Sequence, residues 1–176
     1  MRSEWVNDDV LGHILAALTE PNRLACAVSI ATGLRIGDVL SLKTEQLQRS
    51  ARVTVREQKT GKSRRVYFGD ELRAQLLRQA GRVWVFEGRL DWRHHRTRQA
   101  VYKDLRRAAA AFRVRERVSP HSMRKVYAVR YYNSTRHEKD LAALRKVLNH
   151  SDEAVTLIYA IADQLTRQHN RRCKRS

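Results

Sequence analysis

The chain has 176 residues, of which 42% are hydrophobic and 31% are charged, a composition typical of one folded domain and not of a disordered chain. No apolar stretch reaches the ~20 residues that a membrane-spanning helix needs, and the first residues lack the apolar region of a signal peptide, so an intracellular chain is expected. Lysine and arginine number 36 against 18 acidic residues, and this formal net charge of +18 favours nucleic acid as the partner, with a merely basic surface as the alternative.

The first 42 residues predict three helices. Asn7 can cap a helix over residues 7–19, in which apolar residues recur at helical spacing. Pro21 suits the first turn of a second helix, which is expected to end at Gly33 as its C-cap. A short helix is expected to follow over residues 37–42.

The hydrophobic period changes after this helical region. Apolar residues alternate with polar ones at 53–55 and 66–68, on either side of a Lys-Thr-Gly-Lys sequence, and this pattern predicts a β-hairpin. A third short strand is expected at residues 83–86. Between the hairpin and that strand, the acidic start of residues 70–80 predicts a helix.

The second half of the chain has a helical pattern. Helices are expected over residues 100–112, from Pro120 onward, over residues 140–148 and over residues 152–165. No repeat, linker or low-complexity segment interrupts this order, and a basic tail begins at about residue 166. The expected fold is therefore mainly α with a small three-stranded antiparallel β-sheet, an α+β architecture.

Five separated segments carry candidate catalytic side chains. The six side chains, in chain order, are Arg35, Lys59, His121, Arg124, His150 and Tyr159, of which His121 and Arg124 share one segment. The first arginine lies in a turn between two predicted helices, the lysine lies beside the hairpin turn, and His121 and Arg124 share one helix face at i, i+3 spacing. The second histidine ends one predicted helix and the tyrosine lies in the next. Each segment alone is a weak signal in a chain this rich in arginine, whereas the ordered set is specific.

The ordered set resembles the tyrosine recombinases, the family of phage integrases and of Cre- and Xer-type enzymes. Its most specific parts are ATGLRIGDVLSLK and HSMR…LNHSDEAVTLIYA, and the resemblance extends from about residue 7 to about residue 165. It implies an enzyme that cleaves and rejoins double-stranded DNA through a 3′-phosphotyrosyl intermediate without a metal or other cofactor. It also implies protomers that assemble on DNA, in the cytoplasm and on the nucleoid, and a gene carried by a bacterium, a phage or another mobile element.

The resemblance assigns three positions to phosphate binding and one to the orientation of the site. Arg35 and Arg124 match the two phosphate-binding arginines of the family, and His150 matches a further active-site histidine that can donate a hydrogen bond. Asp38 matches the acidic residue that orients the site. Attack on a phosphodiester builds negative charge on the phosphorus oxygens, and paired hydrogen bonds from guanidinium groups stabilise that charge.

Three further positions match the groups that move protons or attack. Tyr159 matches the nucleophile, and because a free tyrosine has a pKa of about 10 its hydroxyl must lose a proton during attack. His121 is the candidate to assist that transfer. The departing 5′ oxygen must gain a proton, and Lys59 matches the hairpin lysine that acts as general acid.

The chain departs from the family pattern in three respects. Asn149 stands where the family commonly has glycine, and Met123 stands where it usually has leucine; both are mild changes. Residues 1–176 are expected to form one catalytic domain, without the N-terminal DNA-binding domain that recombinases normally carry. We therefore expect either a piece of a longer protein or an unusually short member.

Other interpretations of the sequence are weaker. Gly61-Lys62-Ser63 resembles the end of a nucleotide-binding loop, but Arg56 stands where that motif needs glycine. The two cysteines and seven histidines have no metal-ligand spacing. Trp84 is expected in the core, whereas Trp92 among arginines could also stack on bases. As whole functions, a type IB topoisomerase and a catalytically weak DNA-binding or regulatory module of the same fold remain alternatives.

Overall fold

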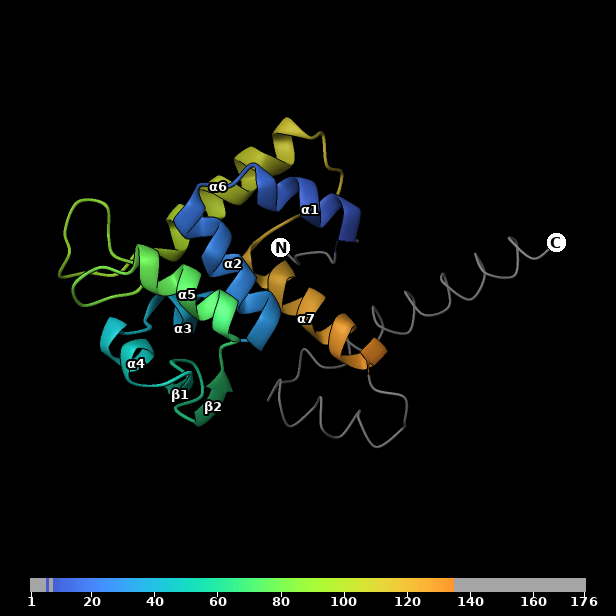
Figure 1. Ribbon diagram of the computed structural model, residues 1–176. Helices are drawn as coiled ribbons and strands as arrows, with labels where there is room; N and C mark the ends of the chain where they lie inside the picture. The colour runs from blue at the N-terminus through green and yellow to red at the C-terminus, as the bar shows by residue number, and fades with distance from the viewer. Residues whose placement is uncertain (1–5, 7, 135–176) are drawn as a thin grey trace.

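The computed structural model describes residue 6 and residues 8–134 of the chain (Figure 1). This part is mainly helical with a small antiparallel sheet, which confirms the predicted fold class. Its elements are α1 (Asp8–Ala16), α2 (Glu20–Thr32), α3 (Ile36–Leu40), α4 (Thr44–Arg49), β1 (Arg52–Arg56), β2 (Ser63–Tyr67), α5 (Asp70–Gln79), α6 (Arg98–Ala111) and α7 (Pro120–Ser134). The two helices predicted over 140–148 and 152–165 lie outside the described residues.

Helix α2 lies at the centre of the molecule. It packs against α1, α3, α5, α6 and α7, and most of its apolar residues are buried. In Figure 1, α1 and α6 lie on one side of α2 and the hairpin lies at the opposite end of the molecule. A helix that is apolar on most of its circumference is stable only when neighbours cover it on all sides, and this arrangement supplies them.

The end of α2 is fixed by Gly33, as its position in the sequence predicts. Gly33 adopts a left-handed conformation with φ 68°, and its N–H donates to the carbonyl of Ser29 at 2.8 Å. A Cβ atom added at Gly33 would lie 2.5 Å from two ring carbons of Tyr127 on α7. Glycine is thus required both for the turn and for the close approach of α7. The residues that follow the turn are therefore held beside α7.

The hairpin of β1 and β2 has the predicted alternation. Val53 pairs with Val66 and Val55 pairs with Arg64, so these four side chains share the inner face of the sheet. Glu57 is the next inward position after Val55, and it is buried. The inner face of the hairpin therefore changes from apolar to charged as it approaches its turn.

The prediction of a third strand at 83–86 is wrong: within the described residues the sheet has two strands. The segment makes only an isolated bridge between Lys43 and Trp84, supported by hydrogen bonds from the Val85 N–H to the Leu42 carbonyl and from the Thr44 N–H to the Val83 carbonyl. The pairing stops there because Thr44 begins α4, a helix that the sequence did not predict. Trp84 is half-buried, with the Lys43 ammonium 3.3 Å from its ring centroid.

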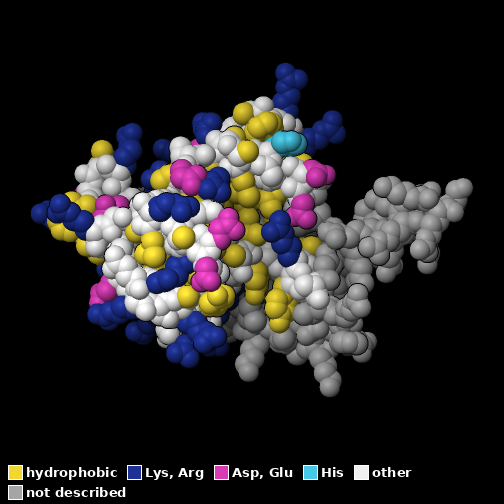
Figure 2. Space-filling view, in the orientation of Figure 1, with side chains coloured by type: hydrophobic (Ala, Val, Ile, Leu, Met, Phe, Trp, Pro, Cys, Tyr) yellow, Lys and Arg dark blue, Asp and Glu magenta, His cyan; other side chains and the backbone are white. Residues whose placement is uncertain are grey.

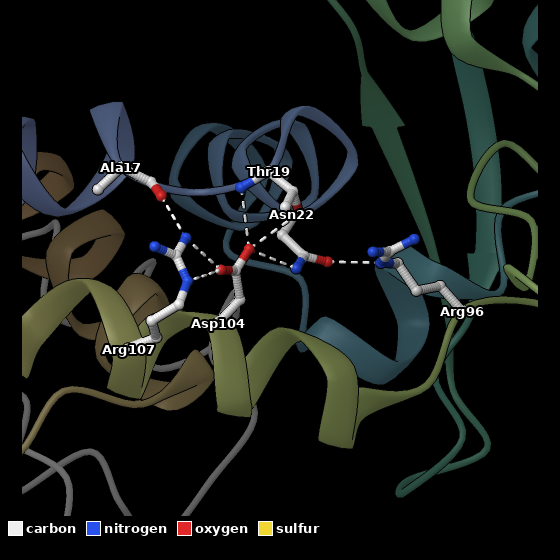
Figure 3. Close-up of polar contacts among 6 residues, drawn as sticks. All are labelled: Ala17, Thr19, Asn22, Arg96, Asp104 and Arg107. Atoms are coloured by element: carbon white, nitrogen blue, oxygen red, sulfur yellow. Dashed lines mark hydrogen bonds and ion pairs between the residues drawn. The ribbon is translucent and has the colours of Figure 1, made fainter.

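Asp104 on α6 connects α6 to the junction of α1 and α2 (Figure 3). Its Oδ2 accepts hydrogen bonds from the N–H and hydroxyl of Thr19 and from the amide of Asn22, and its Oδ1 accepts from the guanidinium of Arg107. Arg96 donates to the Oδ1 of Asn22 at 2.6 Å. Burial favours the neutral acid, but these hydrogen bonds outweigh it and lower the pKa of Asp104 to about 2.

The surface of the described part is rich in basic side chains. Figure 2 shows Lys and Arg side chains spread over one face, with fewer acidic side chains among them. None of the helices within residues 8–134 is long and apolar enough to cross a membrane. The distribution agrees with the excess of basic residues in the sequence.

Candidate active site

Arg35 lies in the short connection between α2 and α3. Its backbone is extended, with φ −67° and ψ 146°, and it directly precedes the first turn of α3. The side chain is 17% exposed, and its Nη1 donates to the Oε2 of Glu57 at 2.7 Å. The other terminal nitrogen of Arg35, Nη2, is buried and has no hydrogen-bond partner in the part of the chain that the structure describes. One guanidinium edge is thus fixed by a carboxylate while a second donor stays unused.

Glu57 lies where β1 ends and the hairpin turn begins. Its side chain is only 3% exposed, and its Oε2 accepts hydrogen bonds from Arg35 and from the hydroxyl of Thr60, the latter at 2.9 Å. Burial favours the neutral acid, but these two hydrogen bonds outweigh it and hold the pKa of Glu57 below its usual value. Glu57 is therefore a carboxylate at neutral pH.

Asp38 lies in the first turn of α3 and is also buried. Its Oδ1 accepts a hydrogen bond from the backbone N–H of Gln58 at 2.9 Å. Burial, with the nearby negative charge of Glu57, raises the pKa of Asp38 despite this hydrogen bond and the charges of Arg35 and Arg124. The second carboxylate oxygen, Oδ2, has no hydrogen-bond partner among the described residues. The negative charge of Asp38 is consequently stabilised less well than that of Glu57.

Arg124 enters the same cluster from α7. It is 5% exposed, and burial together with the positive charge of Arg35 lowers its pKa to about 10, against the favourable charges of Glu57 and Asp38. Arg124 therefore remains a cation at neutral pH. Residues from the α2–α3 connection, α3, the hairpin and α7 thus form one charged group, which we call the arginine–carboxylate cluster: Arg35, Asp38, Glu57, Arg64 and Arg124.

Arg64 and Glu57 are the members of this cluster that the sequence motifs missed. Arg64 lies on β2 and donates to the backbone carbonyl of Thr32, the last residue of α2. Burial lowers the pKa of Arg64, partly offset by Tyr127 and by the two carboxylates of the cluster. Both residues could have been found from the alternation of the hairpin, because each occupies an inward position that an apolar residue would normally fill.

The remaining predicted residues are placed as follows. Lys59 is exposed in the hairpin turn, within residues 58–60. His121 is exposed in the first turn of α7, three residues before Arg124, and its backbone N–H donates to the Ser119 hydroxyl at 3.2 Å. His150 and Tyr159 lie outside the described residues. The structure therefore brings Arg35, Asp38 and Arg124 together.

In the described ranges, histidine, cysteine, aspartate and glutamate side chains form no group of three or more that could hold a metal ion. The cations of the arginine–carboxylate cluster are guanidinium groups, which can donate hydrogen bonds to phosphate oxygens directly.

Comparisons with known sequences agree with this geometry. A family model described as "Phage integrase family" matches residues 4–165. The probable integrase/recombinase YoeC of Bacillus subtilis (strain 168) is 30% identical over 142 residues, which cover 78% of this chain and 75% of YoeC. The tyrosine recombinase XerD of Lacticaseibacillus casei is 30% identical over 153 residues, 79% of this chain and 48% of that protein. The chain thus spans about half the length of this XerD.

Solved structures share the fold at low sequence identity. The crystal structure of XerA recombinase has a TM-score of 0.69 at 20% identity, covering 94% of this chain and 63% of XerA. A lambda integrase dimer bound to a COC′ core site has a TM-score of 0.71 at 18% identity, covering 91% of this chain and 60% of the integrase. XerH bound to its difH substrate in a post-cleavage complex has a TM-score of 0.70 at 17% identity, with 99% and 54% covered.

Proposed function

This chain belongs to the phage integrase family, and from that premise we propose that it is the catalytic domain of a site-specific tyrosine recombinase, which cleaves and rejoins double-stranded DNA. Arg35 and Arg124, far apart in the sequence, meet in one buried cluster close enough for their charges to repel. This observation carries the proposal, because two largely buried cations that repel each other are stabilised when an anion binds between them.

The arginines would bind the scissile phosphate. A guanidinium donates two parallel hydrogen bonds to phosphate oxygens, and such bonds strengthen as the phosphorus gains negative charge in the transition state. Nη2 of Arg35, buried and without a partner among the described residues, is a donor available for this purpose. Glu57 and Asp38 would orient the two guanidinium groups, as the hydrogen bond from Arg35 to Glu57 supports.

The chemical step requires a nucleophile and two proton transfers. We assign the nucleophile to Tyr159, whose oxygen forms a bond to phosphorus while the bond from phosphorus to the 5′ oxygen breaks. The tyrosine proton passes to His121, and the departing 5′ oxygen takes a proton from Lys59. His150 donates a further hydrogen bond to the phosphate. The exposed positions of Lys59 and His121, at a hairpin turn and at the start of a helix, leave both side chains accessible to DNA.

The organisation of the whole protein is also proposed. Residues 1–176 would form one catalytic domain whose basic tail, from about residue 166, contacts DNA or a neighbouring protomer. Protomers would assemble on DNA, in keeping with the lambda integrase dimer that is bound to a COC′ core site. The net charge of +18 makes protomers repel one another, and DNA would promote their assembly by neutralising this repulsion. We place this assembly on the bacterial nucleoid.

A nicked suicide substrate tests the proposal. Cleavage of such DNA traps the covalent complex, because the short strand beyond the cut diffuses away and cannot be rejoined. We expect a DNA-shifted protein band on a denaturing gel, and its loss in Tyr159→Phe, in which only the hydroxyl is removed. Binding to intact DNA should be nearly unchanged in that variant. A protein that binds DNA and never forms the band would be the regulatory module instead, and a band that persists in Tyr159→Phe would contradict the nucleophile.

A further inference from the structure

A buried carboxylate outside the family's assigned positions connects Arg35 to the turn that carries Lys59. The Oε2 of Glu57 accepts a hydrogen bond from Arg35 at 2.7 Å and another from the Thr60 hydroxyl at 2.9 Å. Thr60 directly follows Lys59 in the chain. One oxygen atom is therefore shared between a phosphate-binding arginine and the residue next to the general acid.

A second contact fixes the other side of the same turn. The N–H of Gln58, which directly precedes Lys59, donates to the Oδ1 of Asp38 at 2.9 Å. The turn is closed by backbone hydrogen bonds from Glu57 to the Lys62 carbonyl at 2.9 Å and from Gly61 to the Glu57 carbonyl at 2.8 Å. The residues on either side of Lys59 are thus both tied to carboxylates of the arginine–carboxylate cluster.

Stability alone does not account for a carboxylate at this position. The side chains of Glu57 and Arg35 are 3% and 17% exposed, and a buried ion pair is often no more stabilising than apolar residues of the same volume. Val53 and Val55, on the same face of β1, show what the inner face otherwise holds. A carboxylate here costs desolvation, and what it provides instead is a fixed geometry between two cationic segments.

We propose that Glu57 is a positioning residue that sets Arg35 and Lys59 relative to each other, so that one scissile phosphate meets both. Through Arg35 it fixes a donor to the non-bridging oxygens. Through Thr60 it fixes the turn from which Lys59 reaches the departing 5′ oxygen. This inference rests on the proposed function, and it adds a residue to the site that the resemblance does not assign.

Replacement of the 5′ bridging oxygen by sulfur separates the two effects. A sulfur leaving group departs without a proton, so a defect that acts through Lys59 disappears on this substrate, whereas a defect that acts through Arg35 persists. Lys59→Ala is the reference, and it should be slow on normal DNA and restored on the sulfur substrate. For Glu57→Gln we expect cleavage of normal DNA to fall by about tenfold or more, as small displacements in a site typically cause. The sulfur substrate should restore part of this loss. The cleavage rate on the sulfur substrate, divided by the rate on normal DNA, should therefore be higher for Glu57→Gln than for wild-type protein.

Two variants control this experiment. Thr60→Val removes the contact to the turn and leaves the ion pair of Arg35 in place, so its smaller defect should be fully restored by sulfur. This variant also keeps the test open if Glu57→Gln fails to fold. Glu45→Gln removes an exposed glutamate that pairs with Arg49 on α4, and it should cleave both substrates at the wild-type rate.

The possible failures are distinguishable. The positioning role of Glu57 would be overturned if wild-type protein forms covalent product while the ratio of cleavage rates on the sulfur and oxygen substrates is unchanged in both Glu57→Gln and Thr60→Val. The same holds if Glu57→Gln cleaves normal DNA at the wild-type rate. No covalent product from the wild-type protein on either substrate would overturn the proposed function, and the role of Glu57 with it.

Discussion

Two groups in this molecule each combine a buried carboxylate with arginines, and they do so with opposite results for the pKa of that carboxylate. In the group around Asp104, both carboxylate oxygens accept hydrogen bonds and the pKa of the acid falls to about 2. In the arginine–carboxylate cluster, burial raises the pKa of Asp38 and lowers that of Arg124 to about 10. Hydrogen bonds outweigh burial in the first group, whereas burial prevails at these two residues of the second.

The difference separates a structural contact from a binding site. The hydrogen bonds to Asp104 connect α6 to the junction of α1 and α2, and no oxygen of this carboxylate is left unused. The second group keeps a buried nitrogen on Arg35 and a buried oxygen on Asp38 without hydrogen-bond partners among the described residues. Buried polar atoms without partners cost free energy, and they are typical of places where a ligand completes the bonding. A phosphate has the charge and the acceptors to do so for the arginine.

The largest expected effect concerns the arginines of the two groups. Arg124→Lys keeps a positive charge but loses the paired hydrogen bonds to phosphate, so covalent cleavage should fall by about 100-fold or more. Arg107→Lys, the same change in the Asp104 group, should leave cleavage within about twofold of wild type and lower the free energy of unfolding by about 1 kcal/mol. Single-turnover cleavage and urea unfolding measure the two quantities. Equal cleavage by both variants would remove the functional distinction between the groups.

The next effect is on stability. Asp104→Asn leaves Arg107 without its counter-ion and weakens the hydrogen bonds from Thr19 and Asn22, so we expect the free energy of unfolding to fall by about 2 kcal/mol. Asp91→Asn is the matched control. Asp91 also accepts hydrogen bonds, from the Arg93 N–H and from His94, but its side chain is 43% exposed, and its replacement should lower the free energy of unfolding much less than that of Asp104. Similar losses in both variants would mean that the Asp104 group stabilises no more than a surface contact.

The sequence alone also predicts the two groups to different extents. Arg35, Asp38 and Arg124 were found because their spacing resembles a family, and the structure brings them together. The Asp104 group was not predicted, since its members come from two distant segments and each residue alone is an ordinary polar side chain. Nothing local in the sequence marks a contact that forms only when α6 packs on the junction of α1 and α2.

Two further misses have local causes. The family motif assigns Lys59 in the turn and does not include Glu57, although the position of Glu57, the next inward one after Val55, marks it as a buried charge. The strand expected at 83–86 follows from four consecutive apolar residues, and Val85 and Phe86 are indeed buried. Burial, however, does not create a strand when the facing segment turns into α4 after one bridge.

A smaller change in the free energy of unfolding is expected when the pH is lowered. The pKa of Asp104 is about 2 in the folded protein and near 3.8 in the unfolded chain, so the carboxylate stabilises the fold above the unfolded pKa, and this contribution is lost as pH falls toward 2. About 1 kcal/mol of this contribution should disappear between about pH 5 and about pH 3. Urea unfolding at several pH values measures the loss, as the difference between wild type and Asp104→Asn. The two proteins should converge in stability at the acid end, and a constant difference would contradict the ionic origin.

The smallest expected change in stability is that of Asp38→Asn, and it separates the two groups most sharply. Because the pKa of Asp38 is raised in the folded protein, its negative charge opposes folding above that pKa. Removing the charge should therefore lower the free energy of unfolding by no more than about 0.5 kcal/mol, or raise it slightly. Asparagine keeps the acceptor for the Gln58 N–H. Cleavage should nevertheless fall, since Asp38 holds the residue before Lys59 and its charge offsets those of Arg35 and Arg124. Urea unfolding and the suicide-substrate assay, made on the same preparation, measure the two effects. A loss of stability as large as that of Asp104→Asn would show that Asp38 serves the fold, and the contrast between the two groups would then be one of degree.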